Sequence, residues 1–342
     1  MAVTRADVAA AAGVSPAVVS YVINGGPRPV AARTRERVEQ AISTLGYRPN
    51  AVASALRRGR TRVIGLLTES PVNPFFAELT EAITNEATSH GLALTLGIAD
   101  IVGERHLPFL HSVVDHRVDG VIAATDHFSQ LASSVLGTVP VVSIQSTHGH
   151  VRGTSDEVQF DNEHAAQLAV EHLIEHGYTE IAAIAGPWLS TSADRRILGW
   201  RDTLTSAGLP AGDDLIEHAD FTAADGRSAA HALFGRVARH HSRPRSPRAV
   251  FVSSDVQAIG VLQACSELGL RVPEDLAIIS VDGTDIGLRM SPPLTSVRQP
   301  LELMAAAAVN ALLTEPRSDP RPIPPFRGQL VIGRSCGCDP HK

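Results

Sequence analysis

Short apolar runs alternate with helical segments along most of this chain, and this alternation constrains its fold more than any other feature. The runs are rich in Val, Ile and Ala. Parallel strands buried on both faces are short and apolar, and each parallel pair needs a helical crossover. The pattern therefore predicts a parallel, doubly wound α/β body. We predict strands at 63–67, 92–98, 120–124, 139–144, 180–185, 215–219, 248–252 and 276–281.

Helical periodicity fills the intervals between these strands, at 75–89, 105–116, 128–136, 162–176, 193–207, 225–239 and 255–268. The βα pattern runs through the body twice, which predicts two similar Rossmann-like lobes. Aromatic residues make up only 4% of the chain and apolar residues 44%. We therefore expect cores packed from small aliphatic side chains.

Charge separates the first 62 residues from the rest. They hold ten arginines and three acidic residues, which is a formal charge of +7. The remaining residues carry −13, so the whole chain has a net charge of −6. A basic module on an acidic body is expected where one part meets phosphates and the other does not. On charge alone, a solvated basic face explains the pattern equally well.

The basic segment has the signals of three short helices. Thr4 caps a helix over 5–12 that Gly13 ends, and Ser15 and Pro16 begin a second helix that stops at Asn24. A third helix over 34–45 ends at Gly46. Two short helices joined by a tight turn, with a third to complete a core, predict a helix-turn-helix unit.

Two segments make this prediction specific, DVAAAAGVSPAVVSYVIN and TRERVEQAISTLGYRPNAVASALRRGRTRVIGLL. They resemble the headpiece and hinge of the LacI/GalR (lactose-repressor/purine-repressor) family of transcriptional regulators, and the similarity extends over nearly the whole chain. The resemblance implies an all-α helix-turn-helix headpiece at 1–46, a hinge helix and linker at 47–62, and an effector-binding body at 63–342. That body would be an α/β periplasmic-binding-protein-like (type I) domain of two Rossmann-like lobes. Its chain would cross between the lobes three times, so that C-terminal strands complete both sheets.

In this family the second helix reads bases and the hinge helix inserts a leucine into the minor groove. By resemblance, bases are read by Ser15, Pro16, Ala17, Ser20 and Tyr21, and phosphates are held by Thr4, Asn24, Thr34 and Tyr47. The hinge motif matches Tyr47, Pro49 and Asn50, and the minor-groove positions match Ala53 and the wedge Leu56. Outside this context a leucine such as Leu56 more often packs against its own domain.

The reading helix departs from the family pattern. Many members have arginine where this chain has Tyr21, and Pro16-Ala17 occupies the two positions that set half-site preference. The operator sequence is therefore not transferable, although contact between Ala17 and thymine methyl groups is a reasonable hypothesis.

The ligand of such a body binds between its lobes, at the carboxyl ends of the strands. The residues expected there are Glu69, Asn73, Phe76, Gln145, Arg196, Phe221, Ser254, Asp255 and Asp282. Gln145 stands where many relatives have aspartate. Each residue also has a structural alternative: the phenylalanines as core, Asp282 as a brace of its turn, and Arg196 as a partner of Asp194 or Glu163.

One arginine, carboxylates and an aromatic face suit a sugar or sugar derivative, because rings stack on CH faces and charged groups bind hydroxyls. A nucleobase or nucleoside stacked on Phe76 or Phe221 is the alternative effector. Whether the effector is an inducer or a co-repressor is open, because the sign of the coupling is not encoded in any motif.

Other classes of protein receive less support. The chain has no nucleophile elbow, Walker loop or zincin motif, so we expect no enzyme and no cofactor. A solute-binding protein of a transport system would share the body, but the headpiece and the missing signal peptide argue against it. We expect a cytoplasmic regulator whose partners are double-stranded operator DNA and an effector, with no membrane contact.

We expect a homodimer, because helices 75–89 and 255–268 match family segments that pair protomers. The residues after Arg334 contain no heptad repeat for a tetramer. Three cysteines, Cys265, Cys336 and Cys338, predict reduced thiols rather than a disulfide framework. No metal site is expected, since His148 and His150 have no third ligand nearby in the sequence.

Overall fold

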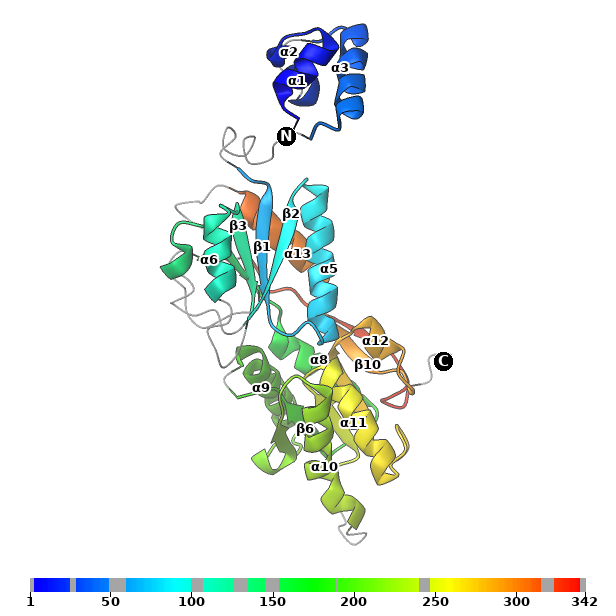
Figure 1. The fold of residues 1–342 in the computed structure, drawn as a ribbon. Coiled ribbons are helices and arrows are strands. Elements are labelled where there is room, and N and C mark those ends of the chain that lie inside the picture. Colours follow the sequence, from blue (N-terminus) through cyan, green and yellow to red (C-terminus); the bar gives the residue numbers. More distant parts are fainter. Residues whose placement is uncertain are drawn as a thin grey trace. The chain divides into compact units, whose positions relative to one another are not determined.

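The computed structural model describes residues 3–24, 29–48, 60–99, 107–125, 134–144, 154–188, 190–239, 247–314 and 323–338. The chain divides into two compact units, Met1–Thr61 and Arg62–Lys342 (Figure 1).

The first unit contains three helices, α1 (Arg5–Ala12), α2 (Pro16–Asn24) and α3 (Ala32–Leu45). At the start of α1, the Thr4 backbone N–H donates to the Asp7 carboxylate at 2.7 Å, and the Asp7 N–H donates to the Thr4 hydroxyl at 3.4 Å. This reciprocal capping box fixes where α1 begins. Gly13 ends α1 with φ 64°, and α2 leaves at 103° to α1. A turn of three residues between nearly perpendicular helices is the geometry of a helix-turn-helix.

Apolar side chains from all three helices form the core of this unit. Val8, Val19 and Val38 are fully buried at its centre. Tyr47, which follows α3, is also buried in this core. The predicted helix at 34–45 begins earlier, at Ala32, and its N-cap residue Ala31 makes no side-chain hydrogen bond.

The second unit has two sheets, and the first belongs to the N-terminal lobe. Its strand order is β2-β1-β3-β4-β5, all parallel. The strands are β1 (Val63–Thr68), β2 (Ala93–Ile98), β3 (Gly120–Ala124), β4 (Val141–Ile144) and β5 (Thr154–Val158). Ile64 and Leu66 face α5 (Pro74–Ser89), while Leu67 packs against α6 (Leu107–Asp115) on the other face. The sheet is thus covered on both sides, as its apolar strands require.

The second sheet belongs to the C-terminal lobe, in the order β11-β10-β9-β8-β6-β7. Its strands are β6 (Ile181–Ala185), β7 (Ile216–His218), β8 (Ala249–Val252), β9 (Ala277–Asp282), β10 (Thr295–Arg298) and β11 (Gln329–Val331), of which only the edge strand β11 is antiparallel. Its helices are α8 (Asn162–Glu175), α9 (Thr191–Ser206), α10 (Ala223–Arg239), α11 (Asp255–Leu268) and the short α12 (Asp285–Leu288), with a 3-10 turn at Asp213–Leu215. Helices α8 and α9 cover one face, and α10 and α11 cover the other.

The chain passes between the two lobes three times. It leaves β5 for α8, leaves β10 for α13 (Leu301–Leu313), and returns from α13 to β11. Phe160 and Phe326 form a parallel bridge where the first and third of these connections lie side by side.

The expectation that C-terminal strands complete both sheets is wrong for the N-terminal lobe. That lobe receives the helix α13, which packs on α5 and on β3 to β5. Met304, Ala305 and Ala308 of α13 are fully buried there. The sheet itself is completed by β5, a strand that the sequence analysis left unassigned. The polar composition of β5, Thr-Ser-Asp-Glu-Val, hides it from an apolar pattern.

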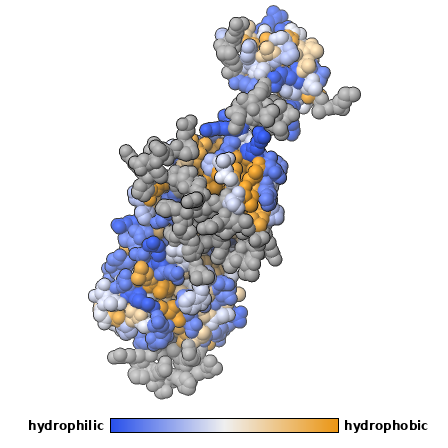
Figure 2. Space-filling model, turned by 90° about the vertical axis from the view of Figure 1, so that its left-hand side faces the viewer, coloured by the Kyte–Doolittle hydropathy of each residue, from blue (hydrophilic) through white to orange (hydrophobic). Residues whose placement is uncertain are grey.

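Hydrophobic and hydrophilic residues are both present on the surface of the body. The face that carries α6 and α9 shows hydrophobic residues scattered among hydrophilic ones (Figure 2). No single helix in the described ranges combines the length and apolar composition that a membrane span needs. The fold class predicted from the sequence is confirmed: a helix-turn-helix headpiece and a two-lobed α/β body.

Candidate effector cavity and DNA-binding surface

A cavity of about 490 Å³, counted to its open mouth, lies between the two lobes of the body. Both sheets direct the carboxyl ends of their strands toward it, as the general rule for open α/β sheets predicts. Seven of the nine residues expected from the sequence line it: Glu69, Asn73, Phe76, Arg196, Phe221, Ser254 and Asp282.

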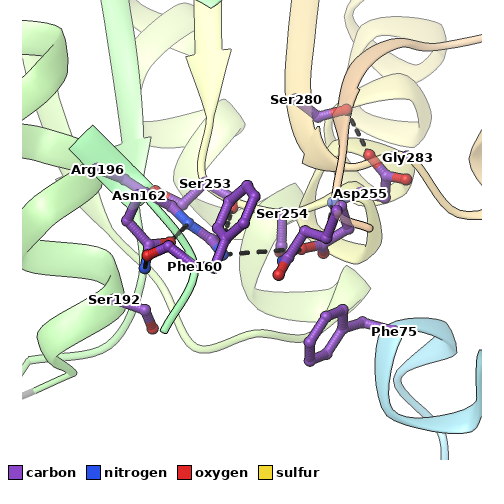
Figure 3. Close-up of polar contacts among 12 residues, drawn as sticks. Phe75, Phe160, Asn162, Ser192, Arg196, Ser253, Ser254, Asp255, Ser280 and Gly283 are labelled. Carbon is purple, nitrogen blue, oxygen red and sulfur yellow. Dashed lines mark hydrogen bonds and ion pairs between the residues drawn. The ribbon is translucent and has the colours of Figure 1, made fainter. Parts of the chain in front are cut away.

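Arg196 on α9 is the central cation of the cavity. Its side chain is buried, with Nε donating to Asn162 Oδ1 at 2.7 Å and Nη1 donating to the Ser253 carbonyl oxygen. Figure 3 shows the guanidinium between Asn162 and Ser253. Its Nη2 lies 3.8 Å from Asp282 Oδ1. The guanidinium is therefore held on several sides in a fixed orientation.

One of the alternative partners of Arg196, Glu163, pairs with a different residue. That residue is the neighbouring, half-exposed Arg195, whose Nη1 lies 2.8 Å from Glu163 Oε1. Arg195 and Arg196 are neighbours on α9, but they point in different directions. Arg195 forms an ion pair at the surface, whereas Arg196 is turned toward the cavity and its pair is buried.

Asp282 ends β9 in a strained conformation. Its φ of 118° lies in the region that L side chains rarely adopt. Gln299 Nε2 donates to Asp282 Oδ1 at 2.9 Å, and burial raises the pKa of this carboxyl to about 7, against the opposing effect of Arg196. Strain and a perturbed pKa on one cavity residue are typical of a functional position.

Asp255, the other predicted carboxylate, does not line the cavity. Its Oδ1 accepts hydrogen bonds from the hydroxyls of Ser280 and Ser296, at 2.6 and 2.7 Å. Its Oδ2 accepts from the backbone N–H of Thr284 at 2.6 Å and from the Thr284 hydroxyl at 2.8 Å. Burial raises the pKa of Asp255, and these hydrogen bonds oppose the shift. The residue thus braces β9, β10 and α12. Asp255 and Ser280 are drawn in Figure 3.

The N-terminal lobe supplies two hydrogen-bonded polar residues and two phenylalanine rings to the cavity wall. Glu69 follows β1, and its carboxylate accepts a hydrogen bond from Thr125, which follows β3, at 3.1 Å. Asn73 caps α5 by accepting from the Phe75 N–H at 3.1 Å. Phe75 and Phe76 then meet edge to face, with ring centroids 5.0 Å apart, and both line the cavity.

Phe221 forms the aromatic wall of the C-terminal lobe. Its ring lies directly over Gly186, where a Cβ atom would come within 2.5 Å of Phe221 Cζ. Glycine at position 186 therefore allows the ring to approach the chain that leaves β6 closely. Phe221 and Phe76 reach the cavity from different lobes.

Six further lining residues were missed: Phe75, Leu79, Ala124, Thr125, Ile144 and Ser192. Three of them stand at or just after the ends of β3 and β4, so the strand-end rule that indicated Glu69 could also have found them. Gln145 follows Ile144 but lies outside the described residues.

The outward face of α2 in the headpiece collects the predicted base-reading residues. Val19 and Val22 point into the core, and the opposite side presents Ser15, Pro16, Ala17, Ser20, Tyr21 and Asn24, all exposed or half-exposed. Asn24 Nδ2 donates to the Ser20 carbonyl oxygen at 3.0 Å, and the Ser15 hydroxyl accepts from the Val18 N–H at 3.4 Å. The predicted base-reading side chains thus share one solvent-facing side of α2.

The remaining predicted DNA contacts have different settings. Thr4 is exposed at the start of α1, with its hydroxyl in the capping box, and Thr34 is half-exposed in the first turn of α3. Tyr47 has its ring in the headpiece core. Asn50, Ala53 and Leu56, together with Pro49, lie outside the described residues.

Comparisons with known proteins agree with both units. Residues 4–50 match the family model for bacterial regulatory proteins of the lacI family, and residues 170–336 match the model for a periplasmic binding protein-like domain. Catabolite control protein A from Priestia megaterium is 35% identical over 318 residues, 91% of this chain and 92% of that protein. The HTH-type transcriptional repressor PurR from Erwinia tasmaniensis is 36% identical over 314 residues, 91% of this chain and 89% of that protein.

Two solved structures give the same result. The lac repressor dimer bound to operator and the anti-inducer ONPF has a TM-score of 0.81 and 29% identity, covering 98% of this chain and 99% of that one. The complex of the transcriptional regulator CelR with cellobiose has a TM-score of 0.71 and 30% identity, covering 97% and 99%. The chain therefore belongs to the LacI family of bacterial transcriptional regulators.

Proposed function

We propose that this regulator is a repressor that binds a pseudo-palindromic operator as a homodimer and responds to a sugar or sugar derivative held between its lobes. One observation carries the effector assignment: the buried Arg196–Asp282 pair lies in the same cavity as the rings of Phe76 and Phe221. A fixed guanidinium and carboxylate bind hydroxyl groups on the edge of a sugar ring, while aromatic faces pack on its CH groups.

Polar groups on the opposite wall of the cavity support this choice. Glu69 and Thr125 add acceptor and donor oxygens on the opposite wall, so a ligand would meet polar groups from both lobes. The CelR structure, a relative of this chain, was solved with cellobiose.

A nucleobase or nucleoside is the second candidate. Phe76 and Phe221 offer stacking plates from opposite lobes. The two candidates differ in what Asp282 must do: a sugar offers hydroxyl donors, whereas a purine offers ring N–H and amino groups.

DNA binding is assigned to the outward face of α2, with Ala17 and Tyr21 at its centre and Thr4, Thr34 and Asn24 toward phosphates. The lac repressor relative was solved as a dimer on operator DNA, and two α2 helices in such a dimer would read two half-sites. The hinge positions Asn50, Ala53 and Leu56 complete the proposed interface.

The dimer proposal is also supported by exposed apolar side chains on the N-terminal lobe. Leu96 and Ile98 of the edge strand β2 are each about half exposed, and Val72 before α5 is 84% exposed. An unpaired strand edge with apolar side chains is a surface that a second copy could cover. We place this homodimer in the cytoplasm and assign it binding rather than catalysis.

For the mechanism, we propose that the effector changes how the lobes close, which the hinge transmits to the headpieces. The lobes already touch beside the cavity, where the Asp285 N–H of α12 donates to Glu78 Oε1 of α5 at 2.8 Å. A ligand that binds one arrangement better shifts the population toward it. The effector can then act on DNA affinity only through this difference in binding.

The test is a titration of purified full-length protein on its operator with sugars in one series and nucleobases and nucleosides in another, read by fluorescence anisotropy. A response to a sugar but to no purine is the expected result. Operator affinity that barely depends on salt would contradict the DNA-binding assignment, because neutralising phosphates with arginines releases counterions.

A further inference from the structure

Four metal-ligating side chains meet in the C-terminal lobe, away from the cavity. They are His172, His176, Cys336 and Cys338, and their ligand atoms all lie within 4.8 Å of one another. His172 Nε2 is 3.3 Å from Cys336 Sγ, and His176 Nε2 is 3.1 Å from Cys338 Sγ. Cys338 Sγ also lies 3.5 Å from His172 Nε2. Each histidine nitrogen therefore lies close to at least one cysteine sulfur, and each sulfur lies close to at least one of these nitrogens.

The sequence separates these pairs by more than 160 positions, which is why no metal site was predicted. The histidines are one helical turn apart at the end of α8 and project from the same side, since residues i and i+4 share a helix face. Their rings meet edge to face with centroids 4.7 Å apart. The cysteines come from the segment that follows β11.

The C-terminal segment is anchored beside α8. Ser335 donates its hydroxyl to the Ile278 carbonyl oxygen at 2.7 Å and accepts from the Thr295 N–H at 2.8 Å. Between the two cysteines, Gly337 has φ 99°, a conformation that L side chains rarely adopt. This turn lets Cys336 and Cys338 direct both sulfur atoms toward α8. A rigid frame of this kind is what a preorganised ligand set requires.

The three nitrogen–sulfur separations, 3.1–3.5 Å, are close to those that one kind of ion imposes. Zinc binds thiolate sulfur at ~2.3 Å and imidazole nitrogen at ~2.0–2.1 Å in a tetrahedron, so neighbouring ligand atoms lie roughly 3.3–3.8 Å apart. Two thiolates and two imidazoles form a complete set of four, with no open position for a substrate. Calcium and magnesium prefer oxygen ligands, so they do not suit this cluster.

A residue outside this set of four contacts one of the sulfur atoms. The Thr295 hydroxyl accepts from the Gly333 N–H at 3.0 Å and lies 3.0 Å from Cys336 Sγ. Because one side of this hydroxyl is taken by an N–H donor, its own hydrogen is free to donate to the sulfur. Hydrogen bonds to a ligand atom of this kind orient it and tune its charge.

From this geometry we infer that His172, His176, Cys336 and Cys338 bind one structural Zn²⁺ per chain. Binding deprotonates both thiols and releases two protons to solvent, while the imidazoles bind in their neutral form. The ion then ties the C-terminal segment to α8. The inference is independent of the operator and of the effector, because none of the four residues lines the cavity or belongs to the headpiece.

The experiment uses full-length protein without a polyhistidine tag, purified in reductant, incubated with Zn²⁺ and separated from unbound metal by gel filtration. Elemental analysis is expected to find one zinc per chain. Cobalt in place of zinc is expected to give the intense visible bands of a tetrahedral thiolate site. The His176→Asn variant is expected to lose at least about 100-fold in zinc affinity, since even outer-sphere changes cost ~10–100-fold.

His176 is exposed, so its replacement tests the ligand without disturbing a core. The double variant C336S/C338S is expected to contain no zinc, and a chelator should lower the Tm of the wild type but not that of this variant. Cys265→Ala is the matched control: its thiol is buried in α11 outside the cluster, so zinc content should be unchanged.

Three results would overturn the inference. They are a wild-type protein without zinc whose two C-terminal thiols react freely with a thiol reagent, a disulfide between Cys336 and Cys338 that persists in reductant, or zinc retained by C336S/C338S. Circular dichroism of each variant separates loss of zinc from loss of fold.

Discussion

Arg196 and Asp282 face each other across the wall of the cavity, with Nη2 3.8 Å from Oδ1 and both side chains almost fully buried. The pair links α9 to the end of β9. Neither charge is solvated, so each depends on the other and on the hydrogen bonds around it.

Replacing Arg196 with methionine should therefore affect both stability and effector binding. Removing one partner of a buried pair costs ~3–5 kcal/mol, and we expect the lower end because Asp282 can take up a proton. The measurement is urea unfolding together with an effector titration. Arg195→Met is the control, because its surface pair with Glu163 is worth under about 1 kcal/mol. Equal losses in the two variants would show that Arg196 has no special role.

The pH dependence of stability should change in Asp282→Asn. Burial raises the pKa of Asp282 from its ordinary value of 3.8 to about 7 in the folded protein. The folded state therefore binds more protons than the unfolded state between these values, and Asp282 lowers the free energy of unfolding as pH rises through that window. Above it, the difference is constant.

The difference in unfolding free energy between wild type and Asp282→Asn, measured by urea titration across this range, should shift steadily in favour of the asparagine variant. A difference that is flat with pH would contradict the assigned shift.

Phe221→Ala should weaken effector binding by at least about 10-fold, or ~1.4 kcal/mol, because the ligand loses its stacking plate in the C-terminal lobe. Operator binding without effector should stay near the wild-type value. Isothermal titration calorimetry measures the first quantity and anisotropy the second. Trp188→Ala, an exposed aromatic of the same lobe that does not line the cavity, should leave effector affinity unchanged.

Ala17→Ser should alter base preference at one position in each half-site. Ala17 is exposed on the outward face of α2, where its methyl group can contact a thymine methyl. Selection from a randomised operator library should show a weaker preference for thymine at that position only. Ala10→Ser, on the exposed side of α1, is the control. An unchanged preference at every position would remove Ala17 from the set of base readers.

Asp255→Ala should destabilise the body by at least about 3 kcal/mol, since it leaves several buried donors without a partner. Asp275→Ala, which removes a carboxylate from an exposed pair with Arg271, should have little effect. Urea unfolding of the two variants checks the contrast. A mild effect at Asp255 would mean that its hydrogen bonds can be replaced by water.

The sequence predicted the cavity largely through one topological rule. Glu69 and Asp282 stand at the ends of apolar runs that are typical of parallel strands. Their closeness at the strand ends could therefore be predicted from the sequence alone. The same rule could not separate Asp282 from Asp255, because both stand near strand ends. Only the tertiary hydrogen bonds to Ser280, Ser296 and Thr284 show that Asp255 points away from the cavity.

Where periodicity was weak or contacts were distant, prediction failed. The polar strand β5 has no apolar alternation, and helix α13 occupies a lobe that its position in the chain does not indicate. The meeting of His172 with Cys336 could not be predicted, because proximity between residues so far apart in the chain depends on the sheet order of the C-terminal lobe.

Helix α13 has a consequence for synthesis of the protein. The first lobe cannot complete its core until Leu301–Leu313 has left the ribosome, because Met304, Ala305 and Ala308 belong to that core. Until then the growing chain exposes the apolar face of an unfinished sheet, a state prone to aggregation and a natural substrate for chaperones. The small headpiece unit, made of local contacts near the N-terminus, can fold long before. During synthesis, the headpiece of this regulator is therefore expected to be folded while the effector-binding body is still incomplete.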